Sequence, residues 1–578
     1  MAETKSFNKV LPILMEDDIR TRLAEERLRL EKDIGIFDKK MEYFKRPVEL
    51  PFTRRQRENT TILFGGLTLK HEQLIIAAFD ALGYHTQNLP MPDVSACQIG
   101  KEYGNNGQCN PTYFTVGNLV QYLQKLEHDG MTKKEIIDNH ILLTAGNACG
   151  TCRFAMYEAE YRLALKNAGF DGFRVYTFNL VGGLVQKSDD GPGLEMNLEF
   201  FLGMINAIVI GDLLNETGYK IRPYEIHAGE TDRVLEQCVF ELQQFLRRYR
   251  TFHFDGPVGR RMTKFKTIHS VVRYAGEFYR QLFGRDIYSI MQKCGKLISQ
   301  IQVDRTRVKP TVKVTGEFWA HLTEGDGNFN MFRFLEREGA QVIIEPVVSL
   351  IQHMMRQIKD ETRERSGVEF DGKTGFRAAV GRLRSYIRGQ KKIFLLYLAD
   401  RALVRKWNYL RRALGNLPHA LLDQYELLEL AHDHYNSKAR GGESHLEIAK
   451  NIYYHKNHLC HMVLSLKPFG CMPSSQSDGV QAAVVNRYKD MIFLPIETAG
   501  EGEINAHSRV QMALGEAKAK AKEEFAVVLA KTKRPLDEIQ SFMDGHPEFK
   551  EPYREAPHYH GISGTSANFI RYVAEHMH

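Results

Sequence analysis

Residues 140–154, HILLTAGNACGTCRF, combine a short strand, a glycine-containing turn and the start of a helix. The apolar run His140–Thr144 predicts a buried strand, and a helical pattern begins near Ala155. A strand that leads through a tight turn into a helix is typical of a βαβ unit. Cys149 and Cys152 lie in the turn, at the carboxyl end of the strand, where open α/β sheets assemble their sites.

The same alternation of strand and helix extends in both directions from this stretch. Further short apolar runs predict buried strands at Thr61–Phe64, Arg174–Phe178, Thr311–Thr315, Gln341–Glu345, Met462–Leu466 and Met491–Pro495. Helical patterns lie between them, which favours parallel sheets. We therefore expect an α/β protein with two Rossmann-like lobes joined by helical segments.

Shifts in composition and pattern divide the chain into five parts. We expect a charged helical arm over 1–55, a first α/β lobe over 56–197, a helical connection over 198–309, a second α/β lobe over 310–512 with a helical insertion over 346–456, and a C-terminal helix and tail over 513–578.

Composition narrows the class of protein. The chain has 578 residues, too many for one hydrophobic core, and its 43% hydrophobic and 26% charged content is ordinary for a folded protein. The net charge of +7 is spread along the chain, and no nucleic-acid-binding motif accompanies it. An acidic N-terminal segment and the lack of a long apolar run predict a cytoplasmic protein without a membrane span.

Eight cysteines occur, and their grouping is the main chemical signal: Cys97, Cys109, Cys149, Cys152, Cys238, Cys294, Cys460 and Cys471. Cys238 and Cys294 fall inside helical patterns, which predicts core packing. The other six lie in loops or beside strands. Because a reducing cytoplasm disfavours structural disulfides, such a group indicates metal or redox chemistry.

Several cysteine chemistries fit this pattern. Thiolates suit iron–sulfur clusters, glycine-rich loops allow main-chain amides to approach the sulfides, and a helix N-terminus would stabilise the negative charge. The pair Cys149 and Cys152 also fits a redox disulfide, and a structural zinc site or unligated thiols are further alternatives. The residues alone favour the cluster and leave the others open.

Five segments, taken together, resemble a known family: CQIGKEYGNNGQCNP (97–111), TAGNACGTCRFAMYEAEYR (144–162), VKVTGEFW (312–319), NFNMFRFLEREGAQV (328–342) and KPFGCMPSSQSDGV (467–480). They look like the cysteine-bearing half of acyl-CoA dehydratase activase proteins, which belong with the 2-hydroxyacyl-CoA dehydratase and double-cubane cluster protein superfamily. The similarity runs from about residue 60 to GTSANF near the C-terminus.

This resemblance implies an iron–sulfur site between the two lobes. It makes Cys97, Cys109, Cys149, Cys152 and Cys471 the expected ligands. Cys460 lies outside the matching pattern, but it would complete the six thiolates of a double-cubane [8Fe-9S] cluster, which we favour over a single [4Fe-4S] cluster. The resemblance also suggests that Glu317 lines a pocket or lies near the cluster, although a capping role fits it equally well.

The family further implies a partner. Electrons come from an actin/hexokinase-type ATPase reductase with its own [4Fe-4S] cluster, and neither that ATPase nor a phosphate-binding loop occurs in this sequence, so we expect no ATP site here. The chain would then form a homo- or hetero-oligomer, with basic helices around Arg382–Arg412 as a docking surface.

The function that follows is ATP-dependent, low-potential electron transfer by an iron–sulfur oxidoreductase. It would reduce a small molecule, an acyl-CoA substrate or a partner protein. Two alternatives remain from the sequence: a non-catalytic [4Fe-4S] relay or activator subunit of a dehydratase system, and a thiol–disulfide oxidoreductase that uses Cys149 and Cys152.

Overall fold

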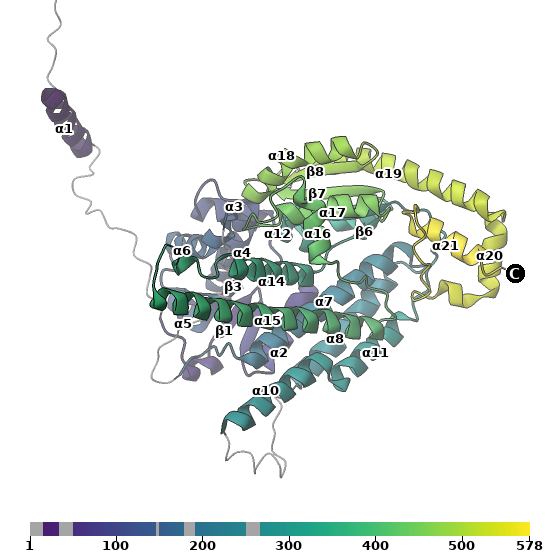
Figure 1. The fold of residues 1–578 in the computed structure, drawn as a ribbon, viewed down its shortest axis with the longest axis horizontal. Coiled ribbons are helices and arrows are strands. Elements are labelled where there is room, and N and C mark those ends of the chain that lie inside the picture. The colour runs from purple at the N-terminus through teal and green to yellow at the C-terminus, as the bar shows by residue number, and fades with distance from the viewer. Residues whose placement is uncertain are drawn as a thin grey trace, which may run out of the picture. The chain divides into compact units, whose positions relative to one another are not determined.

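The structure is a computed structural model that describes residues 16–33, 50–145, 150–178, 191–249, 266–370 and 372–577. Its chain divides into two units, Met1–Glu49 and Leu50–His578. The first contributes one charged helix, α1 (Glu16–Asp33). All other elements belong to the second unit (Figure 1). Cys149 lies outside the described residues.

The first lobe contains a four-stranded parallel sheet in the order β2-β1-β3-β4. Its strands are β1 (Thr61–Phe64), β2 (His85–Asn88), β3 (His140–Ala145) and β4 (Arg174–Phe178). Three of these strands were predicted, whereas β2 was missed. Its sequence, HTQN, is polar and partly exposed because it forms the edge of the sheet, so it lacks the apolar run that marks β1 and β3.

Five α-helices belong to this lobe: α2 (Leu69–Asp80), α3 (Val94–Tyr103), α4 (Asn110–His128), α5 (Lys133–Asn139) and α6 (Tyr157–Asn167). Asp93 caps α3, since its side chain accepts the N–H of Ala96 at 2.7 Å. α4 begins with proline in its first turn, where a missing N–H costs nothing.

The second lobe repeats the arrangement with the order β6-β5-β7-β8, also fully parallel. Its strands are β5 (Thr311–Gly316), β6 (Gln341–Ile343), β7 (Met462–Pro468) and β8 (Ile492–Thr498). Every residue of β5 and β7 is buried, and their apolar residues Val312, Val314, Leu464 and Leu466 belong to the hydrophobic core. All four strands lie within a few residues of the predicted positions, so the two-lobed α/β architecture is confirmed.

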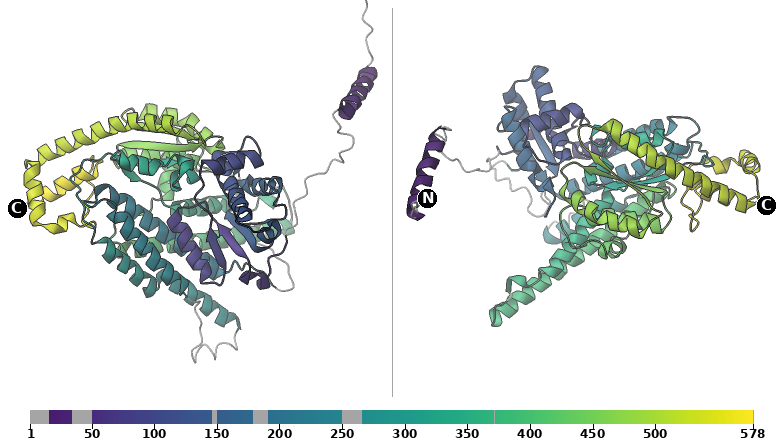
Figure 2. Two further views of the ribbon diagram at one scale, coloured as in Figure 1. Left: turned by 180° about the vertical axis from the view of Figure 1, so that it is seen from behind. Right: turned by 90° about the horizontal axis from the view of Figure 1, so that it is seen from above.

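The connection from β6 to β7 is helical, as predicted. It contains α14 (Val347–Glu364), α15 (Phe376–Ala413), α16 (Gln424–His432) and α17 (Ser444–Lys456). Figure 2 shows the green helices of this connection projecting from the body in its right-hand view. The remaining α-helices near this sheet are α12 (Phe318–Leu322), α13 (Met331–Arg337) and α18 (Met472–Arg487).

A helical segment joins the lobes through α7 (Leu198–Ile221), α8 (Glu230–Arg247), α10 (Lys266–Phe283) and α11 (Arg285–Ile298). Asp212 of α7 contacts both lobes. One carboxylate oxygen lies 3.1 Å from Nε2 of His71, and the carboxylate accepts the N–H groups of Val347 and Val348, each at 2.9 Å. The apolar residues of both sheets also belong to one continuous core, which includes Ile62 and Val312.

Within the described residues, one helix is long and apolar enough to cross a membrane, and it is α7 with its extension, Leu198–Tyr224. However, 72% of its most apolar window is buried inside the protein, and α7 contributes heavily to the core described above. Its hydrophobicity is therefore explained by its central position.

The C-terminal region forms its own apolar cluster. α19 (Glu503–Thr532) begins ten residues before the predicted helix start and leads from the second sheet to α20 (Leu536–Gly545) and α21 (Thr565–Ala574) (Figure 1). The short 3₁₀ helices of the chain are η1 (Arg54–Glu58), η2 (Arg153–Met156), η3 (Arg222–Tyr224), η4 (Asp326–Asn328), η5 (Val368–Phe370) and η6 (Pro547–Lys550).

Candidate functional site

In each sheet, the direction in which successive strands are added to the sheet reverses at one position. In the first sheet the chain moves from β1 outward to β2 and then to β3 on the other side of β1; in the second, β5, β6 and β7 repeat this order. Ligands of open α/β proteins bind at the carboxyl ends of the two strands that flank such a point. Glu317 directly follows β5, and Cys471 follows β7.

Four side chains of the two lobes share a feature: each belongs to the residue that immediately precedes a helix. Cys109 precedes α4, Cys152 precedes η2, Glu317 precedes α12 and Cys471 precedes α18. Burial is the main cause that raises the pKa of all three thiols; Glu317, when ionised, raises it further, and a charge on Cys109 raises that of Cys152 and Cys471. The four residues therefore lie together although they come from four separate segments.

Direct contacts between loops of the two lobes hold this arrangement. The N–H of Asn110 donates to the carbonyl oxygen of Phe469 at 2.9 Å. Gly470 has a φ of 77°, and a Cβ added there would lie 3.3 Å from the Cα of Cys109 and 2.8 Å from the carbonyl oxygen of Gln108. Glycine is needed at position 470 both for its backbone conformation and for this close approach.

Burial keeps the thiols protonated in the absence of a ligand. It raises the pKa of Cys152 and of Cys471 to about 12, and it also raises the pKa of Cys109. In each case a main-chain N–H of the following helix opposes this effect and lowers the pKa. The positive ends of these helices would thus favour anionic sulfur once a metal replaces the proton.

Cys109 has the most polar surroundings of the three. Its Sγ lies 3.1 Å from the hydroxyl oxygen of Thr112 and 3.2 Å from that of Tyr157. Either hydroxyl could donate to a thiolate at this position. The Tyr157 phenol itself stays protonated, because burial raises its pKa well above the usual value.

The donor set fits an iron–sulfur cluster. Three soft sulfur ligands lie within electrostatic range of Glu317, each beside a helix N-terminus, and Cys149 precedes one of them, Cys152, by three residues in the sequence. Among the residues that the structure describes, no three His, Cys, Asp or Glu side chains are close enough to share one metal ion. A cluster separates its protein thiolates more widely, because each one binds a different iron atom.

Two buried carboxyl groups accompany the thiols. Burial raises the pKa of Glu317 to about 7 and that of Glu443 to about 8. The carboxylate of Glu317 accepts the N–H of Ala320 at 3.0 Å, and that of Glu443 lies 4.0 Å from Nδ1 of His321. Sequence analysis singled out Glu317 but missed Glu443, which lies in a loop without a recognisable motif. Both acids can hold a proton near neutral pH.

The remaining predicted ligands occupy other positions. Cys97 is buried in α3, where its Sγ lies 3.9 Å from Oδ1 of Asn110, the residue after Cys109, and packs against Gly500, so it is adjacent to the site. Cys460 is buried just before β7, at the opposite end of that strand from Cys471, in an apolar cluster with Val463. The length of β7 therefore separates Cys460 from Cys471, and the role of Cys460 as a sixth ligand stays a prediction.

The last two cysteines behave as core residues, which confirms the prediction for them. Cys238 in α8 and Cys294 in α11 are fully buried and adjacent, with Sγ of Cys238 3.8 Å from the carbonyl oxygen of Cys294. All seven cysteines within the described ranges are free thiols.

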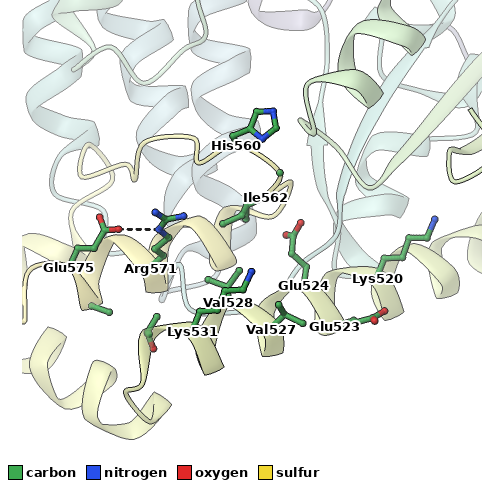
Figure 3. A pocket seen from close by; sticks show the side chains of 13 residues that line it. Lys520, Glu523, Glu524, Val527, Val528, Lys531, His560, Ile562, Arg571 and Glu575 are labelled. Carbon is green, nitrogen blue, oxygen red and sulfur yellow. Dashed lines mark hydrogen bonds and ion pairs between the residues drawn. The ribbon is translucent and has the colours of Figure 1, made fainter.

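A cavity of about 840 Å³ lies elsewhere, between α19 and the C-terminal tail (Figure 3). Its charged groups are largely paired with one another or with the main chain: Arg571 bonds Glu575 at 3.0 Å, and Glu524 accepts the N–H groups of Ser563 and Gly564, each at 2.7 Å. None of the cysteines lines this cavity, so it is not part of the candidate site.

Comparisons with protein-family models and with curated proteins find no match for this chain. The resemblance to the dehydratase activase superfamily therefore stays a prediction. Because Rossmann-like lobes support many unrelated chemistries, the function has to be argued from the site itself.

Proposed function

We propose that this protein binds an iron–sulfur cluster and transfers low-potential electrons in the cytoplasm. The observation that carries the proposal is that Cys109, Cys152 and Cys471 each immediately precede a helix and lie within electrostatic range of Glu317, with Cys152 after β3 of the first sheet and Cys471 after β7 of the second. Cys149 is the fourth ligand that we propose, since it lies three residues before Cys152 in the sequence. The free state of the described cysteines fits a reducing compartment.

The geometry favours a single [4Fe-4S] cluster over the double-cubane [8Fe-9S] cluster expected from the sequence. The larger cluster was expected to use six thiolates. Cys460 lies at the far end of β7 from Cys471, and Cys97 contacts the Asn110 side chain, so the cluster that we propose uses Cys109, Cys152, Cys471 and Cys149. Four thiolates are the usual ligand set of one four-iron cluster.

The cluster would supply one-electron chemistry, and the protein would set its potential. Tyr157 and Thr112 can donate hydrogen bonds to the Cys109 sulfur, and hydrogen bonds to ligating sulfur raise the reduction potential. Glu317 and Glu443 can remain protonated near neutral pH, so they add little negative charge beside the thiolates. Burial of the site limits contact with water.

A thiol–disulfide enzyme is the weaker proposal. Such an enzyme needs a thiol whose pKa is lowered toward neutral, because the thiolate is the nucleophile. Burial raises the pKa of Cys152 to about 12, so Cys152 would not be the attacking thiol; in a Cys-x-x-Cys pair that role would fall to Cys149, which lies outside the described residues. Metal ligation removes this difficulty, since the metal displaces the thiol proton.

The surface that we propose for the electron-donating partner is the first part of α15. Residues 376–399 carry six basic side chains and no acidic one. Large apolar side chains are also exposed there, including Leu383, Ile387 and Phe394, each with more than half of its surface accessible. This combination fits a partner surface that is acidic around an apolar centre. The family resemblance makes an ATPase reductase the candidate partner, with a small molecule, an acyl-CoA or another protein as the final acceptor.

Anaerobic purification followed by iron, acid-labile sulfide and visible-spectrum measurements tests the cluster proposal directly. About four irons and four sulfides per chain, with a brown chromophore, are expected for one cubane. About eight irons would restore the double cubane. Zinc, or a colourless protein without iron, would overturn the proposal.

A further inference from the structure

A second, smaller cavity lies at the corresponding edge of the first sheet. It has a volume of about 40 Å³ and lies at the carboxyl ends of β1 and β3, beside Gly65 and Thr144. α4 contributes Asn118 to its wall, and Trp319 reaches it from the second lobe. Since β1 and β3 flank the reversal point of this sheet, this is the other position where an α/β protein of this topology is expected to bind a ligand.

Two polar atoms in the cavity wall lack a partner. Asn118 is 5% exposed and its amide nitrogen donates to the carbonyl oxygen of Pro90 at 2.8 Å, while its Oδ1 is buried and accepts no hydrogen bond. Trp319 is 9% exposed, and its Nε1–H is buried and donates none. Buried polar groups are normally paired, so an unpaired acceptor and an unpaired donor on one small cavity point to an absent molecule.

The cavity is unsuited to anions. In nucleotide-binding α/β proteins, main-chain N–H groups at the start of the first helix hold a phosphate. Here the N–H groups of Gly66 and Leu67 donate to Oε1 of Glu72, at 2.9 and 3.2 Å. Glu324 adds a second carboxyl group to the wall. The ligand is therefore not a phosphate or a carboxylate.

We propose that this cavity binds an uncharged primary amide group. Its carbonyl oxygen accepts the N–H of Trp319, and its NH₂ group donates to Oδ1 of Asn118. A cavity of about 40 Å³ holds about three non-hydrogen atoms, which is the size of this group. The amide belongs either to a small free molecule or to the end of a longer one, because exposed Leu69 and Met91 also line the cavity.

The position places this ligand beside the cysteine site. Asn118 lies on α4, which Cys109 precedes, and Tyr161, which also lines the cavity, lies one turn after Tyr157 on α6. The inference does not depend on the iron–sulfur proposal, since the cavity and its unpaired groups involve none of the cysteines.

Tryptophan NMR tests this inference on the whole protein. The chain has only two tryptophans, and the indole N–H of Trp407 already donates to the carbonyl oxygen of His419 at 2.9 Å, so it serves as an internal control. In ¹⁵N-tryptophan-labelled protein, formamide should shift the Trp319 signal with a dissociation constant on the order of 1 mM and leave the Trp407 signal in place. Formate, which has the same size but is anionic and lacks N–H donors, should shift neither.

Further measurements distinguish a small free amide from the amide of a longer molecule and test the role of Asn118. Tighter binding of butanamide than of formamide would identify the amide of a longer molecule, and weaker binding would identify a small free amide. N118L should weaken formamide binding at least tenfold, with an unchanged Trp407 signal as evidence of folding. Equal responses to formamide and formate, equal shifts of both tryptophans, or no response because only water fills the cavity would each overturn the proposal. If N118L does not fold, the comparison of formamide with formate in the unaltered protein still tests whether the cavity binds an uncharged amide.

Discussion

Replacing Cys471 with serine should abolish cluster binding, whereas the same change at Cys460 should not. The two residues flank β7, whose seven residues, Met462–Pro468, span about 20 Å at roughly 3.3 Å per residue. Thiols separated by that distance cannot serve one four-iron cluster. Serine offers a harder oxygen in place of a soft sulfur, so iron in C471S should fall from about four atoms per chain to below one.

The Cys460 variant also controls for folding. Cys460 is 9% exposed and lies among apolar side chains, so a serine hydroxyl there should cost about 1–3 kcal/mol. C460S is thus expected to lower the midpoint of thermal unfolding while keeping about four irons per chain.

Iron and acid-labile sulfide analysis, together with electron paramagnetic resonance of the dithionite-reduced proteins, measures both variants after anaerobic purification. Circular dichroism reports whether each one is folded. Equal iron loss in folded C460S and folded C471S would refute the separation of these residues, and full iron retention in C471S would refute the ligand assignment.

Three further predictions concern charge. Burial raises the pKa of Glu72 to about 8, so the folded state keeps a proton that the unfolded state has lost, and stability declines by up to about 5 kcal/mol as pH rises from about 4.5 to 8. E72Q removes that decline, so its unfolding midpoint should fall less than that of the wild type between pH 5 and pH 8.5 in thermal scans; parallel curves would contradict this. E345Q should instead lower the stability of the protein. Glu345 accepts a hydrogen bond from buried Lys313 at 3.0 Å, and breaking such a buried pair costs about 3–5 kcal/mol. An unchanged thermal midpoint at pH 7 would be inconsistent with a stabilising pair. On α15, R384E/R388E changes two exposed side chains and should slow association with the reductase partner about tenfold at low salt in stopped-flow measurements. The difference from the wild type should shrink as the salt concentration increases. An effect independent of salt would exclude electrostatic steering by this surface.

Most of the sheet framework could be predicted because its strands are buried. β1, β3, β5 and β7 are short apolar runs, and their order along the chain alternates with helices. β2 could not be recognised, since an edge strand of polar residues has the composition of a loop.

The site was predictable where the sheet rule applied and not elsewhere. Cys152 and Cys471 follow β3 and β7, so the carboxyl-edge rule placed them correctly. Cys460 was included because it would complete six thiolates, and that count takes no account of β7, which carries the chain across the sheet between Cys460 and Cys471. Glu443 depends on how the loop before α17 packs, and local sequence contains no signal for that.

The division of the proposed ligands between the lobes also has a consequence for synthesis of the chain. Cys109 and Cys152 belong to the first lobe, while Cys471 emerges about 320 residues after Cys152. At roughly 5–20 residues per second, the ribosome needs about 15–65 seconds to cover that interval. During this time the early thiols have no complete site to enter. The proposed cluster would be completed only after Cys471 has left the ribosome, so the early thiols would have to stay reduced throughout this interval.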